Sequence, residues 1–420
     1  MTAVTVAERL TVARLAWVMG LRAARRVLAW PVRQIADLSS RGPRALAIAP
    51  QDIRTTDPAI ADDIYAGHFH FAGRIVDSHG TSPFDFTEVP LEWETALMGF
   101  AWLRHLRAAE TALARANARS LIDEWITRQS RQSGGIAWQP QVAARRLISW
   151  LSHSPLPLEG FMKSIGRHVT FLSRQVADGL DGEAKLTAVL ALMQASLCAT
   201  GLESSRRKYE KLLVNTLQAQ VLPDGAHISR NPQVLVDLLL DLLPLRQAFT
   251  ARGLSIPQEL ISCVDRVLPM LRMMRHGDAT LALFNGMGVT APDTLATVLA
   301  YDDARGQPVM NAHYAGYQRL EGDNTIVVCD ATTAALFDAS PCRRAVFRNV
   351  EPGPAHHCQL RRALADARRA ARSRAPDGRP FHPHGGRHVL LPFCEWWHRP
   401  RRLRRCHHRR PVPGRDPPGR

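Results

Sequence analysis

The feature that most constrains the fold of this chain is a series of apolar stripes at helical spacing between residues 91 and 275. In the first stripe the apolar residues recur every three or four positions, at Trp93, Leu97, Phe100, Leu103 and Leu106. Similar segments follow near residues 121–126, 140–151, 160–178, 183–200, 203–222, 232–249 and 257–275. The breaks between them are short and carry Gly, Pro or Asp. The pattern predicts antiparallel helical hairpins that bury their stripes on one another.

The residues before this series have a different pattern. Residues 1–38 are amphipathic and basic, and we expect one or two helices there, whereas residues 39–90 look irregular. The alternation at residues 68–76 predicts a small hairpin with its turn near Gly73. His68 and His70 would lie on one face of that hairpin. Two histidines are too few for a convincing metal site, so we predict none.

The residues after the series change from helical to strand patterning. Residues 316–320 and 325–330 have the pattern of two strands, and residues 321–324 suit the turn between them. We therefore expect a helical domain over residues 91–300 and the first strands of a β-domain over residues 301–340.

The loop at residues 223–232 carries the clearest local signals. Asp224 and Gly225 indicate a turn, and Asn231 followed by proline indicates a capped helix start. His227 and Arg230 lie between these two signals. Two interpretations remain open: a capped turn between core helices, or a loop that holds a base and a cation near an anionic substrate.

The formal net charge of +16 lies almost entirely in one segment. Residues 341–420 contain 20 Arg, no Lys and 5 acidic residues, so the first 340 residues are nearly neutral. A basic surface for nucleic acid is therefore expected only in this tail. The cysteines before residue 341 are scattered singly and predict no disulfide framework. No apolar run is long enough for a membrane span, and the N-terminus lacks the pattern of a signal peptide.

Several motifs, in this order and spacing, resemble the heparinase II/III-like polysaccharide lyases, and among them the bacterial heparinase family proteins. They span about residues 65–330 and are Gly99–Arg104, Trp138–Pro140, Arg145–Leu147, Pro223–Pro232, Arg275–Asp278, Leu283–Gly286 and Gly316–Leu320. The resemblance implies a mostly α fold, in which an incomplete α/α toroid of helical hairpins precedes an antiparallel β-sandwich. In this chain we expect only the start of the sandwich, because its sequence is then truncated or garbled.

The resemblance also implies a reaction, β-elimination next to a uronic acid, with an acidic polysaccharide as partner and no cofactor. Such a site must neutralise the substrate carboxylate, supply a base for C5 and protonate the leaving oxygen. The implied catalytic candidates are His227 and Tyr314. Tyr317 is another tyrosine with two open interpretations, a base or a residue that only packs in a strand. The implied substrate-binding candidates are Arg230, Asn231, Arg275, His276 and Asn285. These residues also have structural explanations: Asn231 suits a helix cap, Arg230 suits a surface cation, and Arg275 and His276 suit a helix C-terminus.

The tail departs from the family pattern, in which a strand with a histidine should follow soon after residue 327. Codons for Arg344–Val350, read one base later, can encode an amphipathic family-like strand, and Arg387–Phe393 gives a similar result with the same displacement. We therefore predict that the reading frame slips between about Thr332 and Pro341. We also expect residues 341–420 to be disordered.

Three functions follow from these observations. The first is a lyase relative that is inactive as written because its β-domain is lost. The second is a non-catalytic helical scaffold or glycan-binding module. The third and weakest is nucleic-acid binding through the tail. The resemblance implies the periplasm or the cell envelope, although a cytoplasmic location stays open because no signal peptide is evident.

Overall fold

The structure is a computed structural model, and it describes residues 17, 20, 43–86, 88–129, 134–153, 160–288, 290–301, 306–322, 325–331 and 345–349. The chain divides into two units, of which one comprises Met1–Thr332 and Arg343–Pro354. All described residues belong to this unit. The other unit, and most of the predicted helical segment at residues 1–38, lie outside the described residues.

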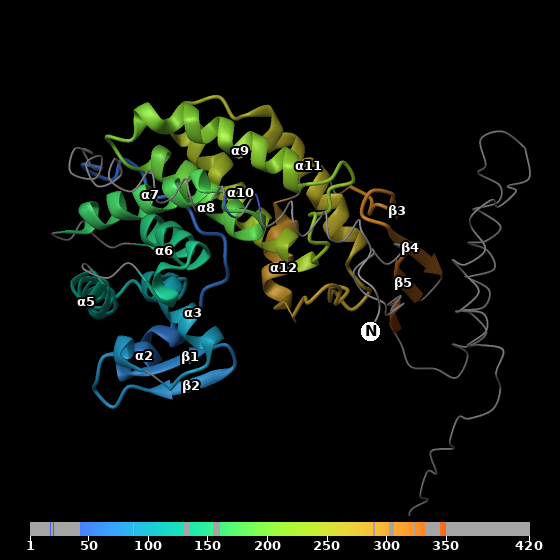
Figure 1. The fold of residues 1–420 in the computed structure, drawn as a ribbon. Helices are drawn as coiled ribbons and strands as arrows, with labels where there is room; N and C mark the ends of the chain where they lie inside the picture. The colour runs from blue at the N-terminus through green and yellow to red at the C-terminus, as the bar shows by residue number, and fades with distance from the viewer. Residues whose placement is uncertain are drawn as a thin grey trace, which may run out of the picture. The chain divides into compact units, whose positions relative to one another are not determined.

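The described residues form eleven named α-helices. Figure 1 shows how most of them are arranged. They are α2 (Ala59–Ala66), α3 (Leu91–Gly99), α4 (Leu103–Ala108), α5 (Ala112–Gln129), α6 (Pro140–His153), α7 (Phe161–Ala177), α8 (Gly182–Cys198), α9 (Arg206–Gln220), α10 (Pro232–Ala251), α11 (Gln258–Met273) and α12 (Pro292–Ala300). Three short 3₁₀ helices are η1 (Pro83–Asp85), η2 (Ile136–Trp138) and η3 (Glu203–Ser205).

The helices from α4 to α11 form two layers. In the inner layer α6 packs on α4 and α8, and α8 packs on α10. In the outer layer α5 contacts α7, and α9 contacts α11. Each inner helix is followed in the chain by an outer helix that runs back beside it, which is the arrangement of an incomplete α/α toroid. The predicted helical hairpins are therefore confirmed.

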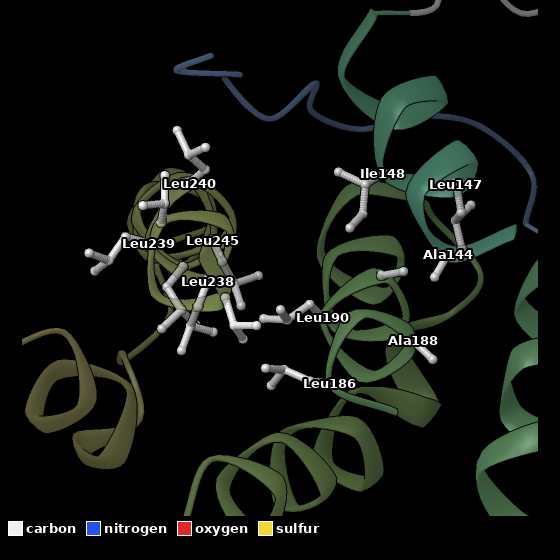
Figure 2. Packing of buried hydrophobic residues seen from close by; sticks show 14 of the residues in the cluster. Ala144, Leu147, Ile148, Leu186, Ala188, Leu190, Leu238, Leu239, Leu240 and Leu245 are labelled. Carbon is white, nitrogen blue, oxygen red and sulfur yellow. The ribbon is translucent and has the colours of Figure 1, made fainter. Parts of the chain in front are cut away.

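The sequence explains which helices lie inside. Helix α8 is buried continuously from Leu186 to Cys198, and α10 from Leu238 to Leu245. A helix that is apolar on all sides must be covered on all sides. Figure 2 shows side chains of α6, α8 and α10 from this inner layer. Outer helices such as α7 bury one face only, with Phe161, Ile165 and Leu172 in the core.

The prediction of one helix across Trp93–Leu106 is wrong in one respect, because the chain forms two helices there, α3 and α4. Phe100 adopts a left-handed φ of +57° and ends α3. Its ring is 0% exposed and packs against Trp102, Trp125 and Trp150, with ring centroids 5.0–6.0 Å apart. The aromatic contacts hold a backbone conformation that the helical spacing alone does not predict.

Two antiparallel sheets are present among the described residues. The predicted hairpin at residues 68–76 is confirmed as β1 (His68–Phe71) and β2 (Arg74–Asp77). The second sheet has the order β3 (Asn311–Ala312), β4 (Tyr317–Gly322), β5 (Thr325–Asp330) and β6 (Ala345–Asn349). Its central pair confirms the second predicted hairpin, with Tyr317 opposite Asp330.

Two further differences concern short elements. Helix α2 lies in the segment 39–90, which we expected to be irregular apart from its hairpin. Strand β6 lies within residues 341–420, where we expect disorder, and pairs antiparallel with β5. Val346 and Phe347 are residue types that strands favour, whichever frame encodes them. Other residues of the tail lie outside the described part. No helix in the described part is long and apolar enough to span a membrane.

Candidate functional site

The loop between α9 and α10 contains most of the residues for which the sequence predicts chemistry. It lies against the turn before β4, where Asp224 Oδ2 accepts a 2.7 Å hydrogen bond from the Ala315 amide. Gly225 has a left-handed φ of +88°, and a Cβ there would lie 2.0 Å from the Arg266 carbonyl oxygen of α11. Because only glycine tolerates this approach, the predicted turn also fixes the loop on α11.

His227, the predicted catalytic histidine, is enclosed in this loop and only 1% exposed. The Ser229 amide donates to Nδ1 at 3.1 Å, so the ring proton is on Nε2, which donates to Gln220 Oε1 at 3.0 Å. The Ser229 hydroxyl oxygen also lies close to Nδ1, at 2.8 Å. Burial lowers the pKa of His227 to about 4. The imidazole is therefore neutral at pH 7, and both nitrogens are engaged in holding the loop on α9.

Arg230 belongs to a junction cluster with Asn285, Tyr317 and Asp330, which joins the helices to the second sheet. Arg230 Nη2 lies 2.5 Å from Asp330 Oδ1 on β5, and Nε donates to the Ala315 carbonyl at 2.9 Å. The guanidinium lies 4.7 Å from the centroid of the Tyr317 ring. The side chains of Arg230 and Asp330 are 23% and 17% exposed. The charge that could meet a substrate carboxylate is thus already paired.

Tyr317 occupies the middle of the junction cluster. Its hydroxyl donates to the Arg230 carbonyl at 2.7 Å and accepts from Asn285 Nδ2 at 2.6 Å. Phe284 stacks on its ring at a centroid distance of 5.1 Å. Burial raises the pKa of Tyr317 to about 12, because the neighbouring Arg230 only partly offsets the loss of solvent. Tyr317 is consequently a neutral hydrogen-bond donor at physiological pH.

The other predicted site residues lie in separate surroundings. Asn231 caps α10, with Oδ1 accepting from the Gln233 amide at 2.9 Å. Arg275 is exposed, and its carbonyl accepts from Arg319 Nη1 at 2.6 Å. His276 is 2% exposed, whereas Tyr314 is 65% exposed. The structure therefore brings Arg230 and Asn285 into contact and leaves the two predicted catalytic residues outside that cluster.

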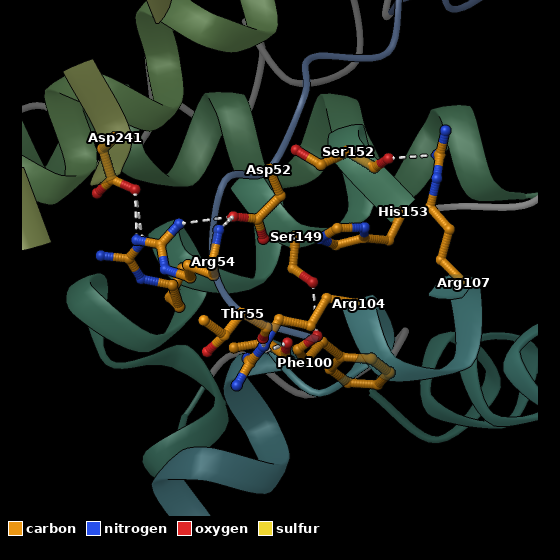
Figure 3. Close-up of polar contacts among 12 residues, drawn as sticks. Asp52, Arg54, Thr55, Phe100, Arg104, Arg107, Ser149, Ser152, His153 and Asp241 are labelled. Carbon is orange, nitrogen blue, oxygen red and sulfur yellow. Dashed lines mark hydrogen bonds and ion pairs between the residues drawn. The ribbon is translucent and has the colours of Figure 1, made fainter. Parts of the chain in front are cut away.

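A second polar cluster, the inner ion-pair network, was not predicted. It joins the segment before α2 to the inner helices (Figure 3). Asp241 Oδ1 accepts from Arg54 Nη2 at 2.7 Å and from Arg145 Nη1 at 2.8 Å. Asp52 Oδ2 lies 2.8 Å from His153 Nε2, and its other oxygen lies 3.3 Å from Arg54 Nη1.

The charges of the inner ion-pair network compensate one another. Burial by itself would raise the pKa of Asp241, but Arg145 and Arg54 outweigh it and hold that pKa below its usual range. Burial of Arg54 is offset in the same way by Asp241 and Asp52, which raise its pKa. The network fastens residues 52–54 to α6 and α10. Within the described residues, no group of three or more His, Cys, Asp or Glu side chains could hold a metal ion.

A signal for this network existed in the sequence. Asp241 is an acidic residue in an otherwise apolar run, where an unpaired carboxylate would be very costly to bury. A carboxylate at that position therefore indicates a cationic partner nearby in the fold. The partner could not be found from the sequence, because Arg54 is distant in the chain.

No family model matches this chain. Among curated proteins it is similar to FtsZ-localized protein C of Caulobacter vibrioides (strain NA1000 / CB15N), with 31% identity over 317 residues. The match covers 69% of this chain and 51% of that protein, so the chain spans about half the length of its curated relative.

Two solved structures are also similar to it. Heparan sulfate lyase HepC from Pedobacter heparinus has 17% identity and a TM-score of 0.48, covering 81% of this chain and 63% of that one. A structure of heparinase III has 13% identity and a TM-score of 0.47, covering 63% of this chain and 48% of that one. At these values neither structure indicates what this chain does.

Proposed function

We propose that this chain is a non-catalytic binding scaffold built on a lyase-like helical array, and that it acts where FtsZ is found. The observation that carries the first part is the pairing of Arg230 with Asp330 at 2.5 Å. A β-eliminating site needs a cation or donor that becomes paired only when the substrate carboxylate arrives. In this chain the Arg230 guanidinium is already paired with Asp330 of the second sheet. The association with FtsZ rests on the name of the Caulobacter relative.

The candidate bases support the same proposal. His227 uses both ring nitrogens within its own loop, and its pKa of about 4 makes it a weak base. Tyr317 has a pKa of about 12 and donates to a carbonyl. The Tyr314 hydroxyl makes no hydrogen bond to any described residue, and its side chain is largely in solvent. A general base needs a partner that holds or activates it within reach of the proton it removes.

A lyase assay tests the catalytic part of this proposal. The purified chain would be incubated with heparan sulfate, chondroitin sulfate and alginate, and formation of the unsaturated uronate followed by ultraviolet absorbance. We expect no product above the level of a His227→Ala, Tyr314→Phe double variant. Turnover by the wild type that this double variant loses would establish a lyase and overturn the proposal.

Co-localisation tests the second part. A fluorescent fusion of the whole chain is expected to follow FtsZ in cells, and to disperse when FtsZ is depleted. A scaffold that binds FtsZ must share its compartment, so the proposal differs from the expectation of export to the periplasm. A fusion that is exported, or whose position does not depend on FtsZ, would contradict it.

A further inference from the structure

A hollow lined by residues of α9 and by the end of α10 contains three cationic residues and one acidic residue. None of these residues belongs to the junction cluster. The hollow lies beside the start of α9 and has a volume of about 500 Å³, within the range of about 300–1,000 Å³ typical of ligand sites. Arg206, Arg207 and Lys211 line it, with Glu210 as an acidic neighbour. None of the three cations has a carboxylate partner among the described residues.

Helix stability does not explain these cations. The N-terminus of a helix carries a partial positive charge, so basic residues in the first turn are unfavourable there. Helix α9 nevertheless begins with Arg206 and Arg207 and has no acidic residue in its first turn. Arg207 and Lys211 are exposed and are separated by one helical turn, so they lie on the same face. The three cations outnumber Glu210, so this face carries a net positive charge.

Three of the residues that line the hollow are apolar. Val214 lies on the same face of α9 as Lys211, and Leu254 and Phe249 come from the turn after α10 and its last residues. Val214 and Leu254 are half-buried, whereas Phe249 is 1% exposed. The lining of the hollow therefore combines exposed cations with partly buried apolar side chains, and one large side chain could cover the latter.

We propose that this α9 hollow binds an acidic peptide segment that inserts one apolar side chain between its charged residues. The carboxylates would pair with Arg207 and Lys211, and the apolar side chain would cover Val214 and Leu254. A saccharide has no comparable apolar group. Single-stranded nucleic acid binds by stacking on accessible aromatic rings, and the Phe249 ring is covered. A membrane surface favours exposed apolar side chains, whereas Val214 and Leu254 are half-buried and Phe249 is covered.

The proposal can be tested with a labelled nine-residue peptide in which one phenylalanine is flanked on each side by four aspartates. Fluorescence anisotropy would measure its affinity for the full chain and for the Arg207→Glu, Lys211→Glu double variant. The matched control is Arg119→Glu, Lys163→Glu, which makes the same change of charge at exposed positions on α5 and α7. The tail arginines add the same background to every variant, so the difference between variants reports on the hollow.

We expect the hollow variant to bind at least tenfold more weakly than wild type, and the control variant to differ by less than twofold. A second peptide with glycine in place of phenylalanine is expected to bind about as weakly to wild type as the first peptide binds to the hollow variant. Circular dichroism checks that each variant is folded.

Three results would overturn the proposal. One is equal weakening in the hollow and control variants, and another is equal affinity of the two peptides for wild type. The third is binding of phosphatidylglycerol vesicles or a single-stranded oligonucleotide that depends on Arg207 and Lys211, without such dependence for the peptide. The lyase and co-localisation results do not bear on this test, so either proposal can fail alone.

Discussion

At the scale of single residues, Arg146 shows how much a polar side chain contributes to the core. It is fully buried, with 0% of its surface exposed. Its guanidinium donates to the carbonyls of Met98 and Ala137 and to His168 Nε2, at 2.7–2.9 Å. It also lies 3.9 Å from the centroid of the Trp125 ring. Through these three hydrogen bonds, one side chain of α6 holds α3, η2 and α7 together.

Arg146→Met is expected to lower the free energy of unfolding by about 3–5 kcal/mol, because it leaves buried acceptors without donors. Arg119→Met on the exposed face of α5 is the control and is expected to change it by less than about 0.5 kcal/mol. Urea denaturation followed by tryptophan fluorescence measures both. Equal stability of the two variants would mean that the Arg146 hydrogen bonds contribute little.

At the scale of elements, the sequence predicted those parts of the fold that depend on local pattern. The helical hairpins, the two β-hairpins and the cap of Asn231 all follow from spacing and turn residues. What depends on distant partners could not be predicted: the break at Phe100, the pairing of Arg230 with Asp330, and the place of Asp241. Each of these is decided by residues far away in the chain, and one sequence does not show which residues those are.

The attachment of β4 to the helices illustrates the same point. Arg319 follows Tyr317 by two residues, so both side chains lie on the buried side of the strand. Its Nη1 donates to the carbonyls of Met273 and Arg275, at 2.8 and 2.6 Å, at and beyond the last turn of α11. A cation at this position satisfies carbonyl groups that a helix end leaves without partners. Strand β4 therefore acts as the C-terminal cap of α11.

The loop between α9 and α10 yields a prediction at this scale. Gly225→Ala is expected to cost more than about 2 kcal/mol, since it combines a left-handed φ with a collision against the Arg266 carbonyl. Gly73→Ala is the control, because Gly73 has a φ of +73° and open space where a Cβ would lie, and it should cost about 1 kcal/mol. Thermal unfolding of the two variants measures the difference. A smaller loss for Gly225→Ala would show that the loop does not rest on α11.

At the scale of the whole molecule, buried histidines make stability depend on pH. Burial lowers the pKa of His105 and His227 to about 4 and that of His168 well below its usual value. In the unfolded chain these groups titrate near pH 6.5, so between about pH 6.5 and 4 the unfolded chain binds more protons. Their contribution to stability is complete above about pH 6.5 and is lost as the pH falls. Asp237, whose pKa is raised by burial, offsets part of this loss.

Scanning calorimetry is therefore expected to give a lower midpoint of unfolding at pH 5 than at pH 7. His227→Gln, which keeps a donor and an acceptor at that position but cannot titrate, should show a smaller decrease. A midpoint that is unchanged or higher at pH 5 would contradict the assignment of neutral buried histidines.

The charge of the chain as a whole is dominated by residues 341–420, for which we propose a displaced reading frame. Resequencing the gene across codons 325–345 tests this directly. We expect one base to be extra or missing relative to a frame that continues the β-domain after β5. An intact frame in which the displaced reading meets early stop codons would refute the proposal, and the tail would then be a genuine basic segment.

The central claim is that Arg230 joins the helices to the second sheet and does not serve a substrate. A double-mutant cycle with Arg230→Gln, Asp330→Asn and both together tests it most directly, by the free energy of unfolding in urea. The two side chains are only partly buried, so we expect each single variant to lose about 1–2 kcal/mol and the coupling energy to be about 1 kcal/mol. Zero coupling and an Arg230→Gln variant of wild-type stability would contradict the claim and leave the guanidinium available for a ligand.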